Sequence, residues 1–323
     1  MTIPKTMRAI AMDGYGGPDV LTLHDLPVPP VGTDDVLIKV AVAGVGVWDG
    51  AERAGLMAPM SPDSVKAFPR ILGADGSGTV VAVGTNVGDF KEGDAVYAYG
   101  FFNPQGGFYA EYASVPATQV ARLPGGLDME QAGALAVTGI TALRGLEDTL
   151  KLQPSQTLLV FGASGGVGLP AVQLAKAMGV QVLAVVSNAD GAALAKAAGA
   201  DSIANSKSDD LAAAIATFAP DGLDAVLACV SANGLDTAIA AVRDGGRIAY
   251  PHGVQPEPQG RPGVAATAYE GAPGREVMDR LNAWIESRRF VVQISGRFAL
   301  ADAVQAHQAL QDHHLGRMIL TVA

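Results

Sequence analysis

Short apolar stretches between glycine and proline turns fill the first third of the chain. They are rich in valine and alanine and recur at the spacing of a barrel or a sandwich. Lys39 interrupts one of them, as expected where one face of a strand meets water. Residues 50–70 contain three prolines and predict a long connection that forms a pocket wall. The expected strands are Met7–Ala11, Val20–Leu26, Val36–Val42, Gly78–Val83, Asp94–Tyr99 and Tyr112–Val115.

The pattern changes near Asp128, where alanine and leucine recur at helical spacing. From Thr157 strands and helices alternate. Five strands joined by four helices predict a doubly wound parallel sheet, whose ligands bind past the carboxyl ends of the strands. The expected strands are Thr157–Phe161, Val180–Val186, Ser202–Asn205, Asp224–Cys229 and Arg247–Tyr250, and the later helices are Ala189–Ala198, Ser208–Phe218 and Gly234–Val242.

Beyond Gly253 a link rich in proline and glycine precedes elements that lack this alternation. For that reason we expect them to return to the first domain. The predicted organisation is one domain built from residues 1–128 and 265–323, with a second domain, residues 129–264, inserted into it. The late elements are a strand at Val264–Ala268, helices at Arg275–Arg288 and Ala301–Asp312, and a strand at Met318–Val322.

Four glycines in seven residues follow the strand Thr157–Phe161: Gly162, Gly165, Gly166 and Gly168. A helical period comes next. Glycines let the backbone turn tightly and approach a pyrophosphate, and the N–H groups of the first helical turn point at the anion. The alternative is a glycine turn that only joins a strand to a helix. The strand–turn–helix context favours a dinucleotide phosphate site instead.

The residues after the second strand of the parallel sheet indicate which dinucleotide binds. An NAD site usually has Asp or Glu there, whereas this chain has Ser187 and Asn188. A carboxylate would repel a 2′-phosphate, while Ser and Asn can donate hydrogen bonds to one. We therefore predict NADPH. Asp190 is the competing carboxylate, but we expect it to cap the following helix, and Lys207 is the nearest positive candidate.

Composition narrows the class of protein. The 323 residues, 49% of them hydrophobic, suffice for two domains. A net charge of -10 and a pI near 4.9 disfavour a general nucleic-acid or anionic-membrane binder. The single cysteine, Cys229, excludes an internal disulfide and predicts a buried filler side chain. We find no signal peptide or membrane span in the sequence and expect a cytoplasmic protein.

The histidines lack the spacing of a metal site. None of them forms H-x-x-x-H or pairs with the cysteine at ligand spacing. His252 follows a strand at the carboxyl edge of the sheet, where it is either functional or an ordinary polar residue. Alcohol oxidation usually needs a Lewis acid or a strong base. Hydride delivery to a quinone or an activated double bond depends less on a Lewis acid or a strong base. Hydrogen-bond donors or water can stabilise the negative charge that forms on the conjugated oxygen. The histidines are His24, His252, His307, His313 and His314.

Several stretches in order along nearly the whole chain resemble one family, the zinc-independent medium-chain dehydrogenase/reductases, and within it the NADPH:quinone oxidoreductase group (zeta-crystallin-like). The resemblance implies an α/β fold in which a Rossmann domain is inserted in a GroES-like β-barrel catalytic domain. It also implies a homodimer, which we expect to form through the strand at Val264–Ala268. The matching stretches are Val36–Asp49, Pro69–Gly84, Gly88–Val96, Gly107–Tyr112, Leu123–Leu143, Gly162–Gly168, Ala197–Asp201, Asp244–Arg247 and Gly316–Val322.

The resemblance also implies roles for individual residues on the coenzyme side. It places Thr141, Val230 and His252–Gly253 near the nicotinamide, and Ser164–Val167 at the pyrophosphate. Ser187 and Ser206 line the adenosine-phosphate pocket. The full set of expected coenzyme-binding residues is Thr141, Gly162, Ser164, Gly165, Gly166, Val167, Ser187, Asn188, Ser206, Val230, His252 and Gly253.

The chain departs from the family pattern at several positions. Zinc-dependent members have a ligand cysteine at Gly46 and His-Glu at Ala74-Asp75, so we expect no metal. Quinone reductases often have Lys at the position of Gly191 and Tyr at the position of Ser206, and both side chains bind the 2′-phosphate. This chain lacks both of these side chains. For the catalytic side we expect Trp48, with Tyr99 or water as the proton donor. The aromatic residues that could form a flat apolar pocket are Trp48, Tyr99, Phe101, Phe102 and Phe108.

Three functions remain open at this point. The first is an NADPH-dependent reductase of quinones or α,β-unsaturated carbonyls that uses no metal. The second is an enoyl-thioester reductase of the same superfamily, which usually needs a tyrosine donor, whereas residues 48–70 contain none. The third is a dinucleotide-binding, crystallin-like protein without turnover. The acidic charge argues against RNA as a partner, so we expect a small molecule as the partner.

Overall fold

The computed structural model describes residues 2–63, 67–288 and 290–322. The chain divides into two compact units, and each is described by itself. The β-rich unit comprises Met1–Val137, Pro273–Glu286 and Val292–Ala323. The sheet-and-helix unit comprises Thr138–Ala272 and Ser287–Val291.

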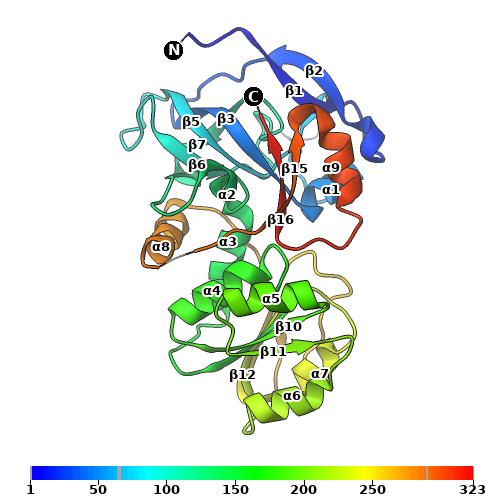
Figure 1. Ribbon diagram of the computed structural model, residues 1–323. Helices are drawn as coiled ribbons and strands as arrows, with labels where there is room; N and C mark the ends of the chain where they lie inside the picture. The colour runs from blue at the N-terminus through cyan, green and yellow to red at the C-terminus, as the bar shows by residue number, and fades with distance from the viewer. Residues whose placement is uncertain (1, 64–66, 289, 323) are drawn as a thin grey trace. The chain divides into compact units, whose positions relative to one another are not determined.

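Two sheets form the β-rich unit (Figure 1). Within the described residues the larger sheet has seven strands in the order β15-β16-β3-β5-β6-β8, and β7 also pairs with β3. The smaller sheet has the order β2-β1-β4. The strands are β1 (Thr6–Met12), β2 (Thr22–Pro27), β3 (Asp35–Val45), β4 (Arg70–Ile71), β5 (Asp75–Val83), β6 (Ala95–Tyr99), β7 (Tyr112–Pro116), β8 (Val120–Arg122), β15 (Ile294–Ala299) and β16 (Arg317–Thr321).

The first strands follow the predicted pattern. In β3 Val36, Ile38 and Val40 are buried in the unit's core, while Lys39 is exposed as expected. Strands β4, β8 and β15 were not predicted. The start of the predicted connection 50–70 is helical, because α1 (Val47–Arg53) covers it. Residues 64–66 of that connection lie outside the described residues.

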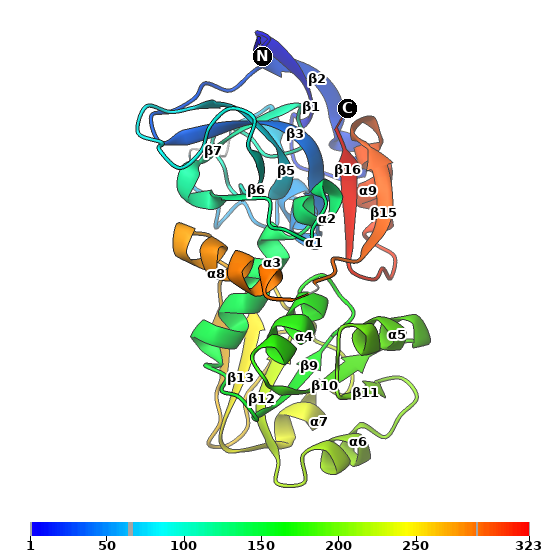
Figure 2. The same ribbon diagram turned by 60° about the vertical axis from the view of Figure 1, so that its left-hand side comes forward.

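Short helices complete this unit. In Figure 2 α9 lies beside β15 and β16. The buried residues of α8 recur at helical spacing, at Val277, Met278, Leu281 and Ile285. The helices are α1 (Val47–Arg53), α2 (Met129–Gly133), α8 (Arg275–Glu286) and α9 (Ala303–Ala309), with single 3-10 turns at Pro18–Val20, Ala117–Gln119 and Leu300–Asp302.

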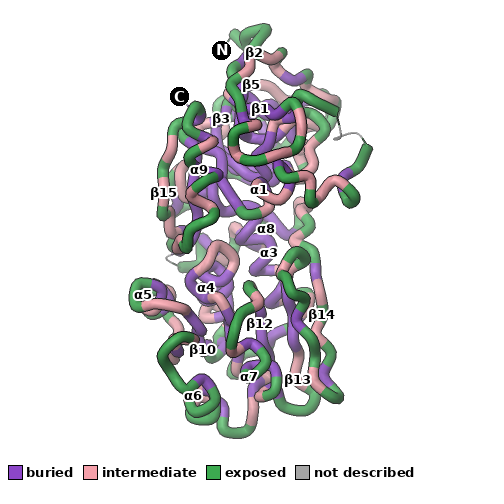
Figure 3. The backbone as a smooth tube through the Cα atoms, turned by 90° about the vertical axis from the view of Figure 1, so that its right-hand side faces the viewer, coloured by how far each residue is buried: buried purple, intermediate pink, exposed green. Residues whose placement is uncertain are grey.

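A parallel sheet forms the centre of the sheet-and-helix unit. Its order is β11-β10-β9-β12-β13-β14 across the part of the chain that is described. Helices α4 and α5 cover one face and α6 and α7 the other (Figures 1 and 2). Figure 3 shows buried central strands, as expected of a sheet covered on both faces. Helix α4 is buried along most of its length, whereas α5 and α6 are each buried at only two positions. The elements are α3 (Ala136–Leu143), a π-helix (Arg144–Thr149), β9 (Thr157–Phe161), α4 (Gly168–Ala177), β10 (Gln181–Val186), α5 (Ala189–Ala197), β11 (Ser202–Asn205), α6 (Leu211–Phe218), β12 (Leu223–Ala228), α7 (Leu235–Ala240), β13 (Val242–Pro251) and β14 (Ala266–Tyr269).

One strand belongs to a different sheet from the one expected. The strand predicted at Val264–Ala268 was assigned to the first domain, but β14 pairs in parallel with β13. The reason is that a parallel strand needs a crossover connection, and the link after Gly253 supplies it without a helix. The inserted unit therefore extends to Ala272 rather than to residue 264.

The predicted fold class is confirmed: a β-rich unit carries an inserted unit with a doubly wound parallel sheet. Among the described residues, no helix combines the length and the apolar character that crossing a membrane requires.

Candidate active site

The four-glycine turn joins β9 to α4. Gly162 has φ +84°, a left-handed conformation that favours glycine. The N–H groups of Gly162 and Ala163 both donate to the carbonyl oxygen of Val185, at 3.1 and 3.0 Å, which anchors the turn to β10. A side chain at Gly162 would lie 2.7 Å from Cγ1 of Val230. The turn is therefore tight and brings Val230, a residue predicted to flank the coenzyme, next to the glycines.

Two serines follow β10 and β11 at the same edge of the sheet. Val186 of β10 is paired with Asn205 of β11, and the N–H of Ser206 donates to the carbonyl of Val186 at 2.8 Å. Ser187 and Ser206 are thus neighbours at the carboxyl ends of adjacent strands. β9 pairs with β10 on its other side, so the glycine turn starts from the same edge.

The cap of α5 differs from the predicted one. Asn188, not Asp190, is the N-cap, because its side-chain oxygen accepts the N–H of Gly191 at 2.7 Å. Asp190 is exposed in the first turn. The oxygen of Asn188 is thus engaged in the helix, and its amide NH₂ remains the group that could donate to a ligand.

Gly191 lies against the glycine turn. A Cβ atom there would be 2.9 Å from Oγ of Ser164 and 3.1 Å from Oδ1 of Asn188. A lysine at this position, which the resemblance implies for many quinone reductases, would have to displace Ser164. The start of α5 and the glycine turn therefore form one cradle.

The remaining residues predicted on the coenzyme side are dispersed. Thr141 is buried on α3, and its side chain packs against Gly271. His252 and Gly253 are exposed, and the N–H of His252 donates to the carbonyl of Tyr269 at 2.9 Å. Their contact with a coenzyme stays a prediction.

In the β-rich unit a buried arginine lies at the start of β16. Arg317 is 3% exposed and donates through Nη2 to Oδ1 of Asp75 at 2.7 Å. The other carboxylate oxygen of Asp75 accepts the N–H of Val137 at 3.1 Å. Cζ of Arg317 lies 4.5 Å from the centroid of the Trp48 ring. Tyr99 is paired with Asp75 across β5 and β6, so both predicted catalytic residues adjoin this ion pair.

Burial raises the pKa values of the carboxyl groups near this arginine. Desolvation raises the pKa of Asp75, although Arg317 and the Val137 N–H oppose the change. Burial also raises the pKa of Asp49 well above its usual range. Asp49 accepts the N–H groups of Gly46 at 2.7 Å and Ala74 at 3.2 Å, and so fixes the start of α1.

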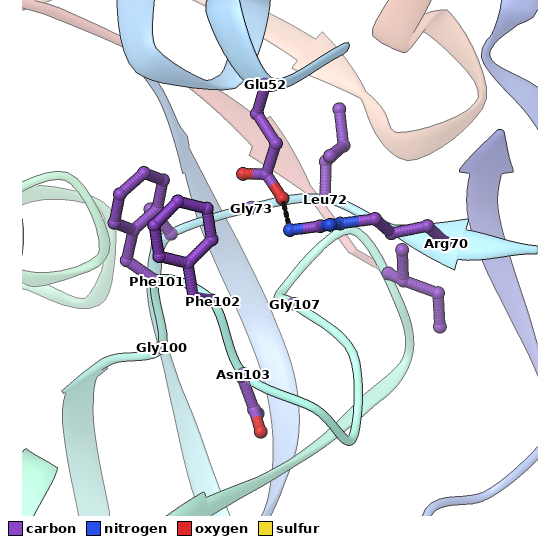
Figure 4. A pocket seen from close by; sticks show the side chains of 11 residues that line it. Glu52, Arg70, Leu72, Gly73, Gly100, Phe101, Phe102, Asn103 and Gly107 are labelled. Carbon is purple, nitrogen blue, oxygen red and sulfur yellow. Dashed lines mark hydrogen bonds and ion pairs between the residues drawn. The ribbon is translucent and has the colours of Figure 1, made fainter. Parts of the chain in front are cut away.

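A small cavity lies beside a second buried ion pair, Glu52 with Arg70 (Figure 4). Phe101 and Phe102 stack with ring centroids 4.2 Å apart, and the Arg70 guanidinium lies 5.9 Å from the Phe102 ring. Of the five aromatic residues predicted to form a pocket, these two line the cavity, whereas Trp48 and Tyr99 do not. Phe108 does not line it. Its side chain is fully buried in the core, because Gly76 and Gly100 leave room for its ring.

A buried histidine completes the polar interior of this unit. His307 is 1% exposed; its Nδ1 lies 3.2 Å from Nη1 of Arg53 and its Nε2 lies 3.0 Å from the hydroxyl of Tyr109. Burial first, and then the charge of Arg53, lower the pKa of His307 to about 3. His307 is therefore neutral at physiological pH.

Signals for these residues in the sequence are weak. Arg317 stands directly before the apolar run Met318–Val322, and a charged residue beside a buried strand is such a signal. Glu52 and Asp75 look like surface residues in the sequence, because their arginine partners lie 18 and 242 residues away in the chain. Across the described ranges no group of three or more His, Cys, Asp and Glu side chains could hold a metal ion.

Comparison with protein families gives matches in both units. A profile described as "Alcohol dehydrogenase GroES-like domain" matches residues 32–125, and one described as "Zinc-binding dehydrogenase" matches residues 166–258. The chain is 32% identical over 323 residues to an "NADPH-dependent alkenal/one oxidoreductase, chloroplastic" of Arabidopsis thaliana, covering 97% of this chain and 78% of that one. A "Quinone oxidoreductase" of Rattus norvegicus is 37% identical over 204 residues, 63% of this chain and 60% of that protein.

Solved structures share the whole fold. A structure titled as an NAD-dependent alcohol dehydrogenase has a TM-score of 0.88 at 28% identity and covers 98% of this chain and 100% of its own. A mycobacterial protein solved with NADPH has a TM-score of 0.82 at 30% identity, with coverage of 98% and 100%. Fold, glycine turn and relatives define the class: the chain belongs to the medium-chain dehydrogenase/reductase family. Within that family, the match to the quinone oxidoreductase relative spans 60% of that relative's length.

Proposed function

We propose that the chain is an NADPH-dependent oxidoreductase that delivers hydride to quinones or α,β-unsaturated carbonyls without a metal. The observation that carries the proposal is the four-glycine turn beside two serines, with no carboxylate directly after β10. The printed names of the rat and Arabidopsis relatives support the two acceptor classes.

The residues present fit this coenzyme. Gly162 holds the left-handed turn, and the approach of Gly191 to Ser164 leaves a cradle that a side chain would fill. The pyrophosphate would lie at Gly162, Ser164, Gly165, Gly166 and Val167, at the start of α4. Ser187, Asn188 and Ser206 would donate to the 2′-phosphate, while Thr141, Val230, His252 and Gly253 would flank the nicotinamide. When bound, NADPH supplies the hydride.

The chain's own residues then have to orient the acceptor and stabilise the negative charge that forms on it. Hydride addition to an enone or a quinone leaves negative charge on a conjugated oxygen, and hydrogen-bond donors lower the energy of that state. Trp48 and Tyr99 adjoin the Asp75–Arg317 pair and are the residues we propose on the acceptor side. The proton that completes the product comes from water or from Tyr99.

Coenzyme choice is tested by placing a carboxylate after β10. Ser187→Asp should raise the Kd for NADPH at least about tenfold and leave NADH binding nearly unchanged, because the new charge repels a 2′-phosphate. Ser155→Asp is the matched control, since it adds the same charge at an exposed residue before the amino end of β9. A chain that binds NADH more tightly than NADPH before mutation contradicts the proposal.

Turnover is tested with purified protein and a panel of acceptors. We expect NADPH oxidation with quinones and enones and much weaker oxidation with crotonyl thioesters. Elemental analysis should find no zinc requirement. Strong activity with the thioesters would favour an enoyl-thioester reductase, and tight NADPH binding without turnover on any acceptor would favour a non-catalytic protein.

We further propose a cytoplasmic homodimer. β14 is an edge strand of the described parallel sheet, and an open edge can pair with the same strand of a second copy. Cys229 is intermediate in exposure rather than fully buried, so the predicted buried filler is corrected in this respect. Desolvation raises the pKa of its thiol to about 12, which disfavours the nucleophilic thiolate.

A further inference from the structure

Arg317 is a buried cation whose N–H groups are incompletely paired. Its Nη2 group binds Asp75, but Nε and Nη1 have no hydrogen-bond partner among the residues that the structure describes. Leaving a buried donor unpaired destabilises a fold, and a charged donor does so more strongly. Native folds rarely keep such groups without a reason.

A third unpaired donor lies beside the other two. The indole Nε1 of Trp48 is buried and likewise has no partner within the described part of the chain. The guanidinium carbon lies 4.5 Å from the Trp48 ring centroid, so the three N–H groups share one small region. All three are donors and none can accept, so their chemical complement is an oxygen that carries negative charge.

The surrounding backbone makes room for this arrangement. A Cβ atom at Gly46 would collide with the six-membered ring of Trp48, and one at Gly44 would collide with Nη2 of Arg317 and with Asp75. Asp75 is itself held by the N–H of Val137. The donors are therefore fixed before a ligand arrives, which is the condition under which they stabilise a developing charge most.

We propose that Arg317 and Trp48 bind the carbonyl oxygen of the acceptor and stabilise the negative charge that forms on it. The identity of the acceptor rests on the proposed function. Hydride addition forms one C–H bond on the acceptor and moves the conjugated electron pair onto this oxygen. The coenzyme is oxidised by two electrons, and a proton from water or from Tyr99 completes the product. Arg317 thereby becomes an oxygen-binding residue of the reaction.

The probe is 4-nitrophenol, whose phenolate carries its charge on one conjugated oxygen and absorbs visible light. Its pKa when bound to the unaltered chain, measured without coenzyme, should fall by at least about one unit. Arg317→Lys keeps the ion pair with Asp75 but removes the unpaired guanidinium donors. Trp48→Phe keeps the ring and removes the indole N–H. Both variants should return the pKa of the bound phenol towards its value in water.

Matched variants separate this role from general effects of the same substitutions. Arg53→Lys changes another buried arginine of the β-rich unit, and Trp284→Phe changes the other tryptophan. Neither should alter the pKa of the bound phenol. In turnover, Arg317→Lys should lower kcat about 100-fold and Trp48→Phe about tenfold, with the Kd for NADPH within about twofold of the unaltered value.

Three results overturn the inference. The first is a lack of phenol binding, or a bound pKa that Arg317→Lys leaves unchanged. The second is a rise in the Kd for NADPH in Arg317→Lys with no change in the phenol, which would assign the donors to the coenzyme's phosphates. The third is full turnover by both variants. If the protein lowers the pKa of the bound phenol but oxidises no NADPH with any acceptor, the oxygen-binding site is supported and the proposed reaction is wrong.

Discussion

Burial shifts the pKa values of ionisable side chains in the β-rich unit, upwards for the carboxyl groups and downwards for the histidine. Burial raises the pKa values of Asp49, Glu52 and Asp75 and lowers that of His307. Desolvation disfavours the charged form in every case and so favours the neutral carboxylic acid and the neutral imidazole. Each group therefore makes the stability of this unit depend on pH.

His307→Gln tests the histidine's share of that dependence. The pKa is about 3 in the folded chain and about 6.5 when unfolded, so the unfolded state binds the extra proton between these values. The stabilisation from neutral His307 is present above pH 6.5 and is lost as pH falls towards 3, by up to about 1.4 kcal/mol per pH unit. His307→Gln should remove this part of the slope.

Tryptophan fluorescence during urea unfolding is the measurement, because Trp48 and Trp284 both lie in the β-rich unit. The acidic residues contribute a slope of opposite sign, since a raised carboxyl pKa stabilises at low pH and loses that effect as pH rises. They are unchanged in the variant, so the difference between the two chains isolates His307. Exposed His313→Gln should leave the slope intact. An unaltered slope in His307→Gln would contradict the assignment.

Sequence patterns identified only part of the site. Glycine spacing and the two serines are local in the chain, so the coenzyme side could be proposed from the sequence. Arg317 and Asp75 are 242 residues apart, and nothing local shows that they pair. The cap of α5 was misassigned because Asn188 and Asp190 are both good caps, and only the backbone conformation decides between them.

At the scale of elements, the turn between β9 and α4 depends on one conformation. Gly162→Ala should destabilise the chain by about 3 kcal/mol, since a positive φ costs about 1–2 kcal/mol and crowding of Val230 adds to it. Gly126→Ala is the control, because Gly126 has φ +96° but a Cβ atom added there would have no neighbour within 4 Å. It should cost only about 1–2 kcal/mol.

Urea unfolding followed by circular dichroism measures both variants, and NADPH titration should show weakened binding in Gly162→Ala alone. Equal destabilisation of the two variants would mean that the contact with Val230 contributes nothing. Equal NADPH affinity would separate the turn from the coenzyme.

Most element predictions rest on the same local patterns. β9 and β11 begin and end where predicted, because each is a short strand between clear turn signals. α1 was missed because Gly46 gives no side-chain cap, and Asp49 supplies that function from inside the helix. β14 was placed in the wrong unit because strand partnership is a long-range property, which four residues cannot encode.

At the scale of the whole molecule, we expect a homodimer, because β14 leaves one edge of the parallel sheet open. Light scattering should give a mass of twice 32.9 kDa for the unaltered chain. Thr267→Lys places a charge on exposed Thr267 of β14 and should give a monomer, because two such strands would then bring like charges together.

Thr79→Lys provides the comparison. Thr79 is also an exposed strand residue, but β5 lies between β3 and β6 and has no open edge. This variant should keep the mass of the unaltered chain. If the unaltered chain is a monomer, the proposed dimer is wrong. If the dimer survives Thr267→Lys, the two copies contact each other through a surface other than β14.

The position of His307 between Arg53 and Tyr109 also fixes a tautomer. A guanidinium can only donate, so Nδ1 of His307 must accept from Arg53, and the single ring proton of the neutral imidazole resides on Nε2. That proton is donated to the phenolic oxygen of Tyr109, which leaves the tyrosine's own hydrogen to point away from the ring. Nitrogen-15 NMR of labelled histidine should therefore show one protonated and one bare ring nitrogen, unchanged across the neutral range.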